Sequence, residues 1–281
     1  MTTSLIGDWI GREDAGSDVV DAVRARRMHA LLDRDPAALS AASALPAGYH
    51  WLYCNSITRR SEWGEDGHAR RGGFLPPLDV SRRMWAGGSL RFLQPLHLGD
   101  AVERRSIITS IEEKEGRSGR FHAVRIDHRI HGPGGVAIEE QQNLVYLPAT
   151  SPPAANAPTF PKSEPEWRDV FTTDEVALFY FSALTMNGHR IHYDYRYATG
   201  TEGYRGLLVH APFTALLMLD AAQRHGSPIR EFSYRAIAPL FCGDTITLAG
   251  TATQPRNQAW ALRPDGSVAM EATFSSAVNL I

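Results

Sequence analysis

One stretch of sequence decides the fold: Gly206-Leu-Leu-Val-His-Ala-Pro-Phe-Thr-Ala-Leu-Leu-Met-Leu-Asp-Ala-Ala222. Its residues are apolar on almost every side of a helix, so a helix formed here must be covered all round. Pro212 suits the first turn of that helix, because the N–H group that proline lacks would have no partner there. The sequence therefore predicts a buried helix at the centre of its domain, enclosed by another layer of structure.

The enclosing layer is predicted to be a sheet, because strand-like runs follow a turn motif that occurs twice. The motif is PLxxGD, at residues 95–100 and again at residues 239–244. Gly-Asp between two such runs marks a tight turn. Alternating apolar and polar residues predict strands after the two copies, over residues 101–111, 124–130, 136–146, 245–253 and 268–278. An internal duplication is the simplest account of the two matching halves.

A buried helix wrapped by a curved antiparallel sheet is the hotdog arrangement, and the duplication predicts an α+β double hotdog. The proline-rich stretch PATSPPAANAPTFPKSEP, residues 148–165, indicates an extended linker. We therefore expect one hotdog domain over residues 1–147 and a second over residues 166–281, each of ordinary domain size. The central helix of the first domain is expected near residues 80–85. This domain looks degenerate and is expected to supply binding surface rather than chemistry.

Two further helices are predicted ahead of the strands. In the second half a capping box over residues 172–175 opens a helix. Apolar residues then follow with helical spacing, at Val176, Phe179, Tyr180, Ala183 and Leu184. In the first half a charged, amphipathic helix is expected over residues 18–39.

Composition and charge exclude several classes of function. Of 281 residues, 43% are apolar and 21% charged, as in globular proteins with a buried core. The net charge of -2 gives no reason to expect nucleic acid as a partner. The two cysteines, Cys54 and Cys242, are too few for a disulfide framework or a zinc site. No export signal opens the chain and no apolar run approaches the ~20 residues of a membrane span, so we expect a cytoplasmic protein.

The residues that could carry chemistry gather in Phe181-Ser-Ala-Leu-Thr-Met-Asn-Gly-His-Arg-Ile-His-Tyr-Asp-Tyr-Arg-Tyr-Ala198. Two parts of the second half, Asn187-Gly-His-Arg-Ile-His-Tyr-Asp194 and Gly206-Leu-Leu-Val-His-Ala-Pro212, resemble the motif of the MaoC-like (R)-specific enoyl-CoA hydratases. The resemblance is closest to the variant in mesaconyl-C4-CoA and itaconyl-CoA hydratases. It implies an enzyme that adds water to, or removes it from, an acyl-CoA thioester. CoA then enters as part of the substrate, and no separate cofactor is implied.

In the family that the motif resembles, an acidic residue five positions before a histidine forms the catalytic dyad. The histidine falls on His192, but the acidic position holds Asn187. A carboxylate can take a proton from water, whereas an amide can only orient one. We therefore assign proton transfer to His192 and the holding of the attacking water to Asn187. Either Asp194 or His189 could complete the proton path, and Asp194 could instead orient His192.

The resemblance also implies a donor for the thioester oxygen, which gains negative charge as water adds. Backbone N–H groups at a helix start stabilise such charge. In the family the donor follows the histidine that begins the central helix, which here places it at Ala211, after His210. Family members often have glycine at that position. Arg190 and Arg196 flank the dyad and are either exposed charges or the groups that bind a free carboxylate on the acyl chain.

Four functions are compatible with these residues. The favoured one is hydration of a carboxylated enoyl-CoA, such as itaconyl-CoA or mesaconyl-C4-CoA, to a hydroxyacyl-CoA such as citramalyl-CoA. The others are dehydration of 3-hydroxyacyl thioesters in fatty acid metabolism, acyl-CoA hydrolysis by a hotdog thioesterase, and acyl binding without catalysis. The His189-x-x-His192 spacing lacks the acidic partners of a metal site, so no metal is expected. A homodimer is possible, because most soluble homo-oligomers are dimers.

Overall fold

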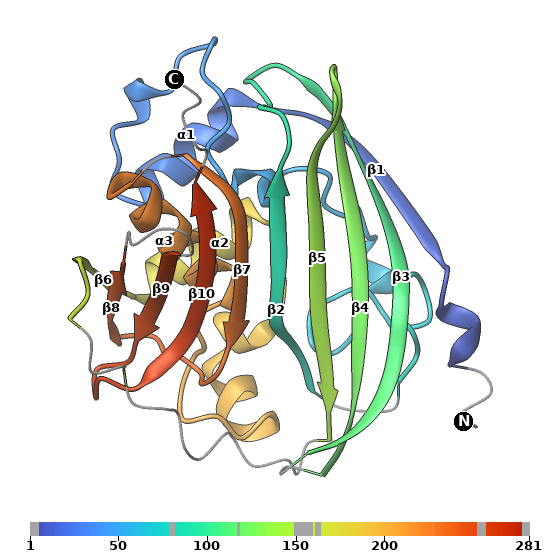
Figure 1. Ribbon diagram of the computed structural model, residues 1–281. Coiled ribbons are helices and arrows are strands. Elements are labelled where there is room, and N and C mark those ends of the chain that lie inside the picture. Colours follow the sequence, from blue (N-terminus) through green and yellow to red (C-terminus); the bar gives the residue numbers. More distant parts are fainter. Residues whose placement is uncertain are drawn as a thin grey trace.

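The computed structural model describes residues 6–78, 82–116, 119–148, 160, 164–226, 228–251 and 257–276. Within them, antiparallel strands form one curved sheet in the order β1-β3-β4-β5-β2-β7-β10-β9-β8-β6 (Figure 1). The strands of the first half are β1 (Glu13–Val19), β2 (Arg82–Phe92), β3 (Ala101–Gly116), β4 (Gly119–Gly132) and β5 (Gly135–Leu147). Those of the second half are β6 (Trp167–Thr172), β7 (Ile229–Ala236), β8 (Thr245–Gly250), β9 (Asn257–Leu262) and β10 (Val268–Ser276).

The two halves of the sheet have the same topology. From the outer edges inward, their orders are β1-β3-β4-β5-β2 and β6-β8-β9-β10-β7, and β2 pairs with β7 where they meet. The same type of hydrogen bond also occurs within each of the two PLxxGD turns. The Asp100 carboxylate accepts a hydrogen bond from the N–H of His97, and the Asp244 carboxylate accepts one from the N–H of Phe241, both at 2.8 Å. The predicted double-hotdog fold is confirmed. Most of the predicted linker, residues 148–165, lies outside the described part of the chain.

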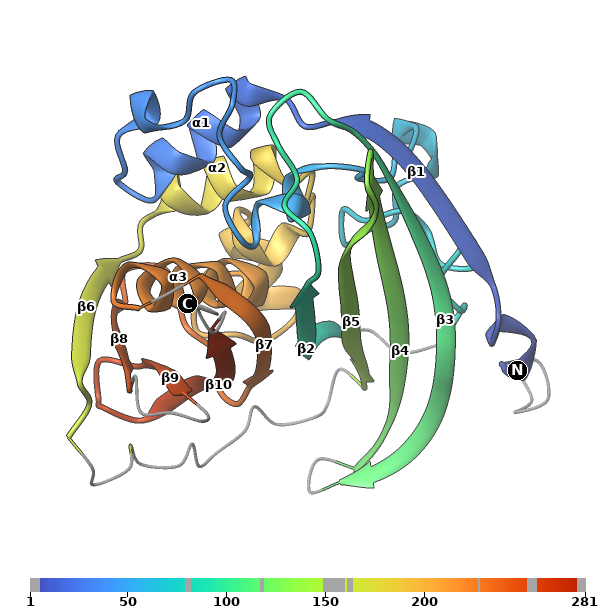
Figure 2. The ribbon, with the colours of Figure 1, turned by 45° about the horizontal axis from the view of Figure 1, so that its top comes forward.

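The central helix of the second half is α3, Ala211–Arg224, which β7, β8, β9 and β10 wrap (Figure 2). Nearly all of its residues are buried, among them Phe213, Leu216 and Met218 at 1% exposure or less. The predicted buried helix is thus confirmed. It begins at Ala211 because residues 206–210 run extended along the turn of the second PLxxGD copy, where Leu208 pairs with Phe241.

The first half has no central helix where one was predicted. Residues 82–92 form β2 instead, which is paired on both sides, with β5 and with β7. A Cβ atom on Gly87 would lie 2.4 Å from the Tyr234 carbonyl oxygen, and one on Gly88 would lie 2.4 Å from the Gln141 carbonyl oxygen. Gly87 therefore allows the close backbone approach to β7 that joins the halves, and Gly88 allows the same approach to β5 within the first half. The segment that includes the short turn η4, Tyr49–Leu52, lies on the concave side of this half, where Phe74 and Leu75 pack against β4 and β5.

The helix predicted over residues 18–39 is shorter in the structure, where α1 spans Ala22–Leu31. Asp18 and Val19 belong to the end of β1. The Asp21 side chain then caps the helix by accepting a hydrogen bond from the N–H of Arg24 at 2.7 Å. A charged sequence can form either a strand end or a helix start, and the cap decides between them.

The helix predicted after residue 172 is present as α2, Glu175–Leu184, but its cap differs from the prediction. Asp174 caps it by accepting from the N–H of Ala177 at 2.7 Å, while Thr172 ends β6. Of the apolar residues with helical spacing, Val176, Phe179 and Tyr180 are at least 53% exposed. The helix is apolar on both faces, so spacing alone did not identify the inner one, which holds Ala177, Leu178, Phe181 and Ser182. Among the residues described, no helix combines the length and apolar character of a membrane crossing.

Candidate active site

A cavity of about 570 Å³ lies between α3 and the concave faces of both halves of the sheet. From the second half it is lined by residues of the predicted motif, including Asn187, His192 and Ala211. Polar residues of the first half, contributed by η4, β3, β4 and β5, line it as well. Three of the residues predicted to act on the substrate therefore line one cavity.

The backbone at the end of α2 positions Asn187. The N–H of Asn187 donates to the Ser182 carbonyl at 2.9 Å, and the N–H of Met186 to the Ala183 carbonyl at 3.5 Å. Met186 has a φ of 52°, the left-handed conformation that closes such a helix end. The Asn187 side-chain oxygen accepts a hydrogen bond from the N–H of His189 at 3.1 Å. This contact orients the amide and leaves its NH₂ group as a donor toward the cavity.

His192 ends a short 3-10 turn, η6 (Arg190–His192), and is only 6% exposed. Its Nδ1 lies 2.8 Å from the carbonyl oxygen of Leu208. A carbonyl only accepts, so Nδ1 carries the proton and Nε2 keeps a lone pair. Burial, His210 and His189 lower the pKa of His192 well below its usual value, which keeps the ring neutral. A neutral imidazole with an unprotonated Nε2 beside a cavity is suited to take a proton.

The start of α3 lies directly beside His192. His210 is the N-cap residue, its Nε2 lies 2.8 Å from Ser182 Oγ, and its ring stacks on that of His192 with centroids 3.5 Å apart. Ala211 and Pro212 follow and line the cavity. The amide of Ala211 belongs to the first turn, whose N–H groups find no partner within a helix. It can therefore donate to an anionic oxygen in the cavity, with the helix dipole adding to the effect.

The structure does not bring Asp194 to His192. The Asp194 carboxylate accepts two hydrogen bonds from the Arg190 guanidinium, at 2.7 and 3.0 Å, and one from the N–H of Tyr197 at 3.0 Å. The imidazole is oriented by the carbonyl of Leu208 instead. An aspartate two positions after His192 in the same turn points away from the cavity, so the predicted support of His192 by Asp194 is replaced by a backbone contact.

The two arginines predicted to bind substrate also lie away from the cavity lining. Arg190 stacks over the Tyr197 ring at 4.3 Å, and its Nη1 donates to the Glu65 carbonyl at 3.0 Å. Arg196 is exposed at the surface. The local sequence did not indicate that the Arg190 side chain points away from the cavity. One of the contacts that hold it there comes from Glu65, more than a hundred residues earlier in the chain.

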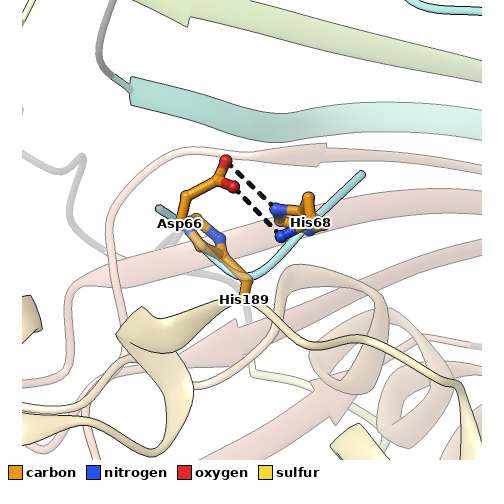
Figure 3. A group of neighbouring side chains, drawn as sticks. All are labelled: Asp66, His68 and His189. Carbon is orange, nitrogen blue, oxygen red and sulfur yellow. Dashed lines mark hydrogen bonds and ion pairs between the residues drawn. The ribbon is translucent and has the colours of Figure 1, made fainter. Parts of the chain in front are cut away.

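A histidine that the sequence did not single out, His68, joins the site from the first half (Figure 3). Its ring lies 4.5 Å from that of His189, and its Nδ1 lies 3.3 Å from an oxygen of Asp66. His189 in turn contacts His192 edge-on, with centroids 5.6 Å apart, and places Nε2 3.2 Å from the Glu202 carboxylate. Burial and the nearby Arg83 lower the pKa of His68 to about 3.

Asp66, His68 and His189 also place potential ligand atoms within 4.8 Å of one another. A ring nitrogen of each histidine is already hydrogen bonded to a carboxylate: His68 to Asp66 and His189 to Glu202. These contacts satisfy the polar groups without an ion, so we interpret the group as a hydrogen-bonded network.

The first half supplies a second set of polar residues that the sequence did not single out. Glu140 accepts hydrogen bonds from Trp51 at 2.9 Å and from His50 at 3.3 Å. Burial alone would raise the pKa of Glu140, but the hydrogen bond from His50 and the nearby imidazoles of His50 and His128 lower it to about 2. His128 on β4 pairs with Glu140 on β5, and Arg104 is on the neighbouring strand β3. One signal was present, since His128 occupies an inward position in the alternation that predicted β4.

Comparison with known proteins gives consistent results for sequence and fold. The family model for hydroxyacyl-thioester dehydratase type 2 matches residues 48–242. Mesaconyl-C(4)-CoA hydratase of Chloroflexus aurantiacus is 40% identical over 94% of this chain and 95% of its own. The mitochondrial hydroxyacyl-thioester dehydratase type 2 of Schizosaccharomyces pombe is 27% identical over 73% of this chain and 77% of its own.

Two solved structures share the fold at low sequence identity. A MaoC-like dehydratase from Phytophthora capsici has a TM-score of 0.70 at 12% identity, covering 99% of this chain and 100% of its own. A Mycobacterium tuberculosis protein described as having a double hotdog fold has a TM-score of 0.60 at 14% identity, covering 95% of each chain.

Proposed function

Since the chain belongs to the hydroxyacyl-thioester dehydratase type 2 family, we propose that it hydrates a carboxylated enoyl-CoA to a hydroxyacyl-CoA. The proposed substrates are itaconyl-CoA or mesaconyl-C4-CoA, and the proposed product is citramalyl-CoA. The observation that carries the proposal is the common cavity of His192, Asn187 and Ala211. A cavity lined by an imidazole, a side-chain amide and the first residue of a helix supports their proposed roles as proton acceptor, donor to water and N–H donor to an anionic oxygen.

In the proposed reaction, written for mesaconyl-C4-CoA, whose double bond is conjugated with the thioester, the Asn187 amide holds a water molecule at the β-carbon. Nε2 of His192 takes a proton from this water as its oxygen bonds to the β-carbon. The electron pair of the double bond moves to the thioester oxygen, where the Ala211 N–H stabilises the negative charge. The α-carbon then takes a proton, which completes the addition. The same groups catalyse dehydration in the reverse direction.

The acyl carboxylate requires a cation in the cavity, and Arg104 is the group we propose for it. Its nearest ion-pair partner among the described residues is Asp14, at 4.0 Å, and its Nε is buried without a hydrogen-bond partner in that part of the chain. Nδ1 of His50 is a second buried nitrogen without a hydrogen-bond partner among the described residues. A guanidinium in such a place is suited to a planar carboxylate. Arg104 thus takes the role that the sequence suggested for Arg190 and Arg196.

Four further expectations accompany this proposal and stay predictions. CoA enters only as part of the substrate, so no separate cofactor is expected. The enzyme is expected to work in the cytoplasm, neither nucleic acid nor a membrane is expected as a partner, and a homodimer is possible. Sedimentation of the purified protein would test the dimer directly.

The decisive experiment mixes the purified enzyme with itaconyl-CoA, mesaconyl-C4-CoA and crotonyl-CoA, and follows enoyl absorbance and free thiol together. Loss of absorbance without thiol release is expected for the two conjugated thioesters, faster for mesaconyl-C4-CoA than for crotonyl-CoA. Formation of citramalyl-CoA from itaconyl-CoA is followed by mass spectrometry. Release of CoA would instead identify a thioesterase. Preference for 3-hydroxyacyl-CoA in the dehydration direction would identify a dehydratase of fatty acid metabolism.

Arg104→Met tests the carboxylate contact in the same assay. Losing a charged hydrogen bond of about 1.5–3 kcal/mol should lower kcat/KM for the carboxylated thioesters roughly 10- to 150-fold. The value for crotonyl-CoA should stay within about threefold, because it has no carboxylate to lose. Arg105→Met is the matched control, since this neighbouring arginine is on the outer face of β3 and is exposed. An equal loss on both classes of thioester would contradict the assignment.

A further inference from the structure

We infer that His68, held by Asp66 and delivered by a loop of the first half, is a second catalytic residue that transfers the proton at the α-carbon of the thioester. This inference rests on the proposed hydratase function. Asn187, an amide, occupies the acidic position of the family dyad, and an amide cannot exchange a proton with the substrate. Another residue must therefore transfer the proton that an acidic residue would transfer.

The loop that carries His68 is docked onto the motif through its backbone. Gly67 has a φ of +88°, and a Cβ atom on it would lie 1.9 Å from the Gly188 carbonyl oxygen. A Cβ atom on Gly188 would in turn lie 2.6 Å from the Gly67 carbonyl oxygen. Only glycine at both positions allows this approach. The loop is therefore built against the residue that directly follows Asn187.

Arg190 fastens the same loop. Its N–H donates to the Asp66 carbonyl at 2.9 Å, and its Nη1 donates to the Glu65 carbonyl at 3.0 Å. Asp194 holds the guanidinium in place. Two motif residues that do not reach the cavity are thus positioning residues for the loop, which explains their place in the sequence.

Asp66 selects the form of His68 that can act on substrate. One carboxylate oxygen of Asp66 accepts from the N–H of His68 at 3.0 Å, and the other lies 3.3 Å from its Nδ1 (Figure 3). The carboxylate accepts, so Nδ1 carries the proton and Nε2 has the lone pair, as in other carboxylate-supported imidazoles. His68 lines the cavity that contains His192, and both rings contact His189.

The two histidines divide the proton transfers of hydration between them. His192 takes a proton from water as the C–O bond forms, and the electron pair of the double bond becomes an enolate. The proton is then passed to His68, and Nε2 of His68 gives it to the α-carbon. Both rings end neutral, as they began, and no other reactant is consumed. In dehydration, His68 removes the α-proton first.

Exchange of the α-hydrogen of butyryl-CoA in D₂O isolates this step, because a saturated thioester has no β-hydroxyl group for His192 to act on. Mass spectrometry should show deuterium uptake with the wild-type enzyme. His68→Gln should lower the exchange rate about 10²–10⁴-fold. Imidazole added to His68→Ala should restore part of the rate, which a purely structural role could not produce. His97→Gln is the control: His97 lies near Asp100 at 3.9 Å but is outside the cavity, and exchange should be unchanged.

Two outcomes overturn the inference. They are exchange at the wild-type rate in His68→Gln, or loss of wild-type exchange on chelation with recovery on adding zinc. The last would make the three residues of Figure 3 a metal site. A wild-type enzyme that neither hydrates enoyl thioesters nor exchanges butyryl-CoA means that the proposed function has failed. One that hydrates them while His68→Gln exchanges normally means that only this inference has failed.

Discussion

The imidazole rings of His192 and His210 are stacked with centroids 3.5 Å apart and planes inclined by 20°. Two charged imidazoles at this distance would repel each other, and both rings are buried. Burial lowers the pKa of His210 to about 3, with His189 adding to the effect. The stack is therefore stable only with neutral rings, which links the stability of the active site to pH.

The first prediction is a loss of stability in acid. The unfolded chain binds protons on His68 and His210 near pH 6.5, whereas the folded chain binds them only near pH 3. The free energy of unfolding should thus be largest above pH 6.5 and should fall as the pH drops toward 3. The slope is up to about 1.4 kcal/mol per pH unit for each residue. Urea denaturation between pH 8 and pH 4.5 measures it, and a flat profile would contradict the pKa assignments.

The second prediction concerns the proton acceptor. In His192→Asn the side-chain NH₂ can still donate to the Leu208 carbonyl, but the basic Nε2 is absent. Hydration should fall about 10²–10⁴-fold. Circular dichroism and the melting temperature should change little, because the buried donor keeps its partner. A variant that hydrates at the wild-type rate would remove His192 from the mechanism.

The third prediction tests the amide at the start of α3. Ala211→Pro removes one N–H group, and His210 already has the ψ of 132° that a residue before proline adopts. The first helical position tolerates proline. We expect kcat to fall about 10²–10³-fold with the fold intact. Ala211→Gly keeps the amide and is the control. Equal rates for the two variants would show that this N–H group does not touch the reacting oxygen.

The fourth prediction separates the two arginines of the motif. Arg190→Met should release the loop of Glu65 and Asp66, and lower kcat at least about tenfold on every thioester alike, because it acts through His68 and not through a substrate carboxylate. Arg196→Ala should leave activity unchanged, since this side chain is exposed. Hydrogen exchange of the loop amides should rise in Arg190→Met only. A loss confined to carboxylated substrates would restore the role first suggested by the sequence.

The parts of the fold that could be predicted are those where one residue pattern has one physical outcome. The stretch that became α3 has no polar face, so burial was the only option, and Gly99 and Gly243 in the repeated turns both need positive φ. The failures came where a pattern has two outcomes. The sequence near residues 80–85 was compatible with a short helix or a strand, and the pairing of residues 82–85 with β5 decides for the strand. The inner face of α2 could not be predicted either, because its exposed face is as apolar as its buried one.

The site was predictable as far as its residues are neighbours in sequence. Asn187 and His192 lie within one turn region, and Ala211 opens the helix that the sequence identified. His68 could not be predicted in the same way, because it reaches the cavity through contacts between backbones distant in sequence. No local pattern around His68 records that Gly67 meets Gly188.

The pairing of β2 with β7 has a consequence for how the protein can be divided. Residues 166–281 made alone would leave β7 with an open edge of unpaired N–H and C=O groups, a surface that invites aggregation. They would also lack the residues of β3, β4 and β5 that line one side of the cavity. In the full chain β2 covers that edge, so one polypeptide contains the counterpart of a symmetric pair of units.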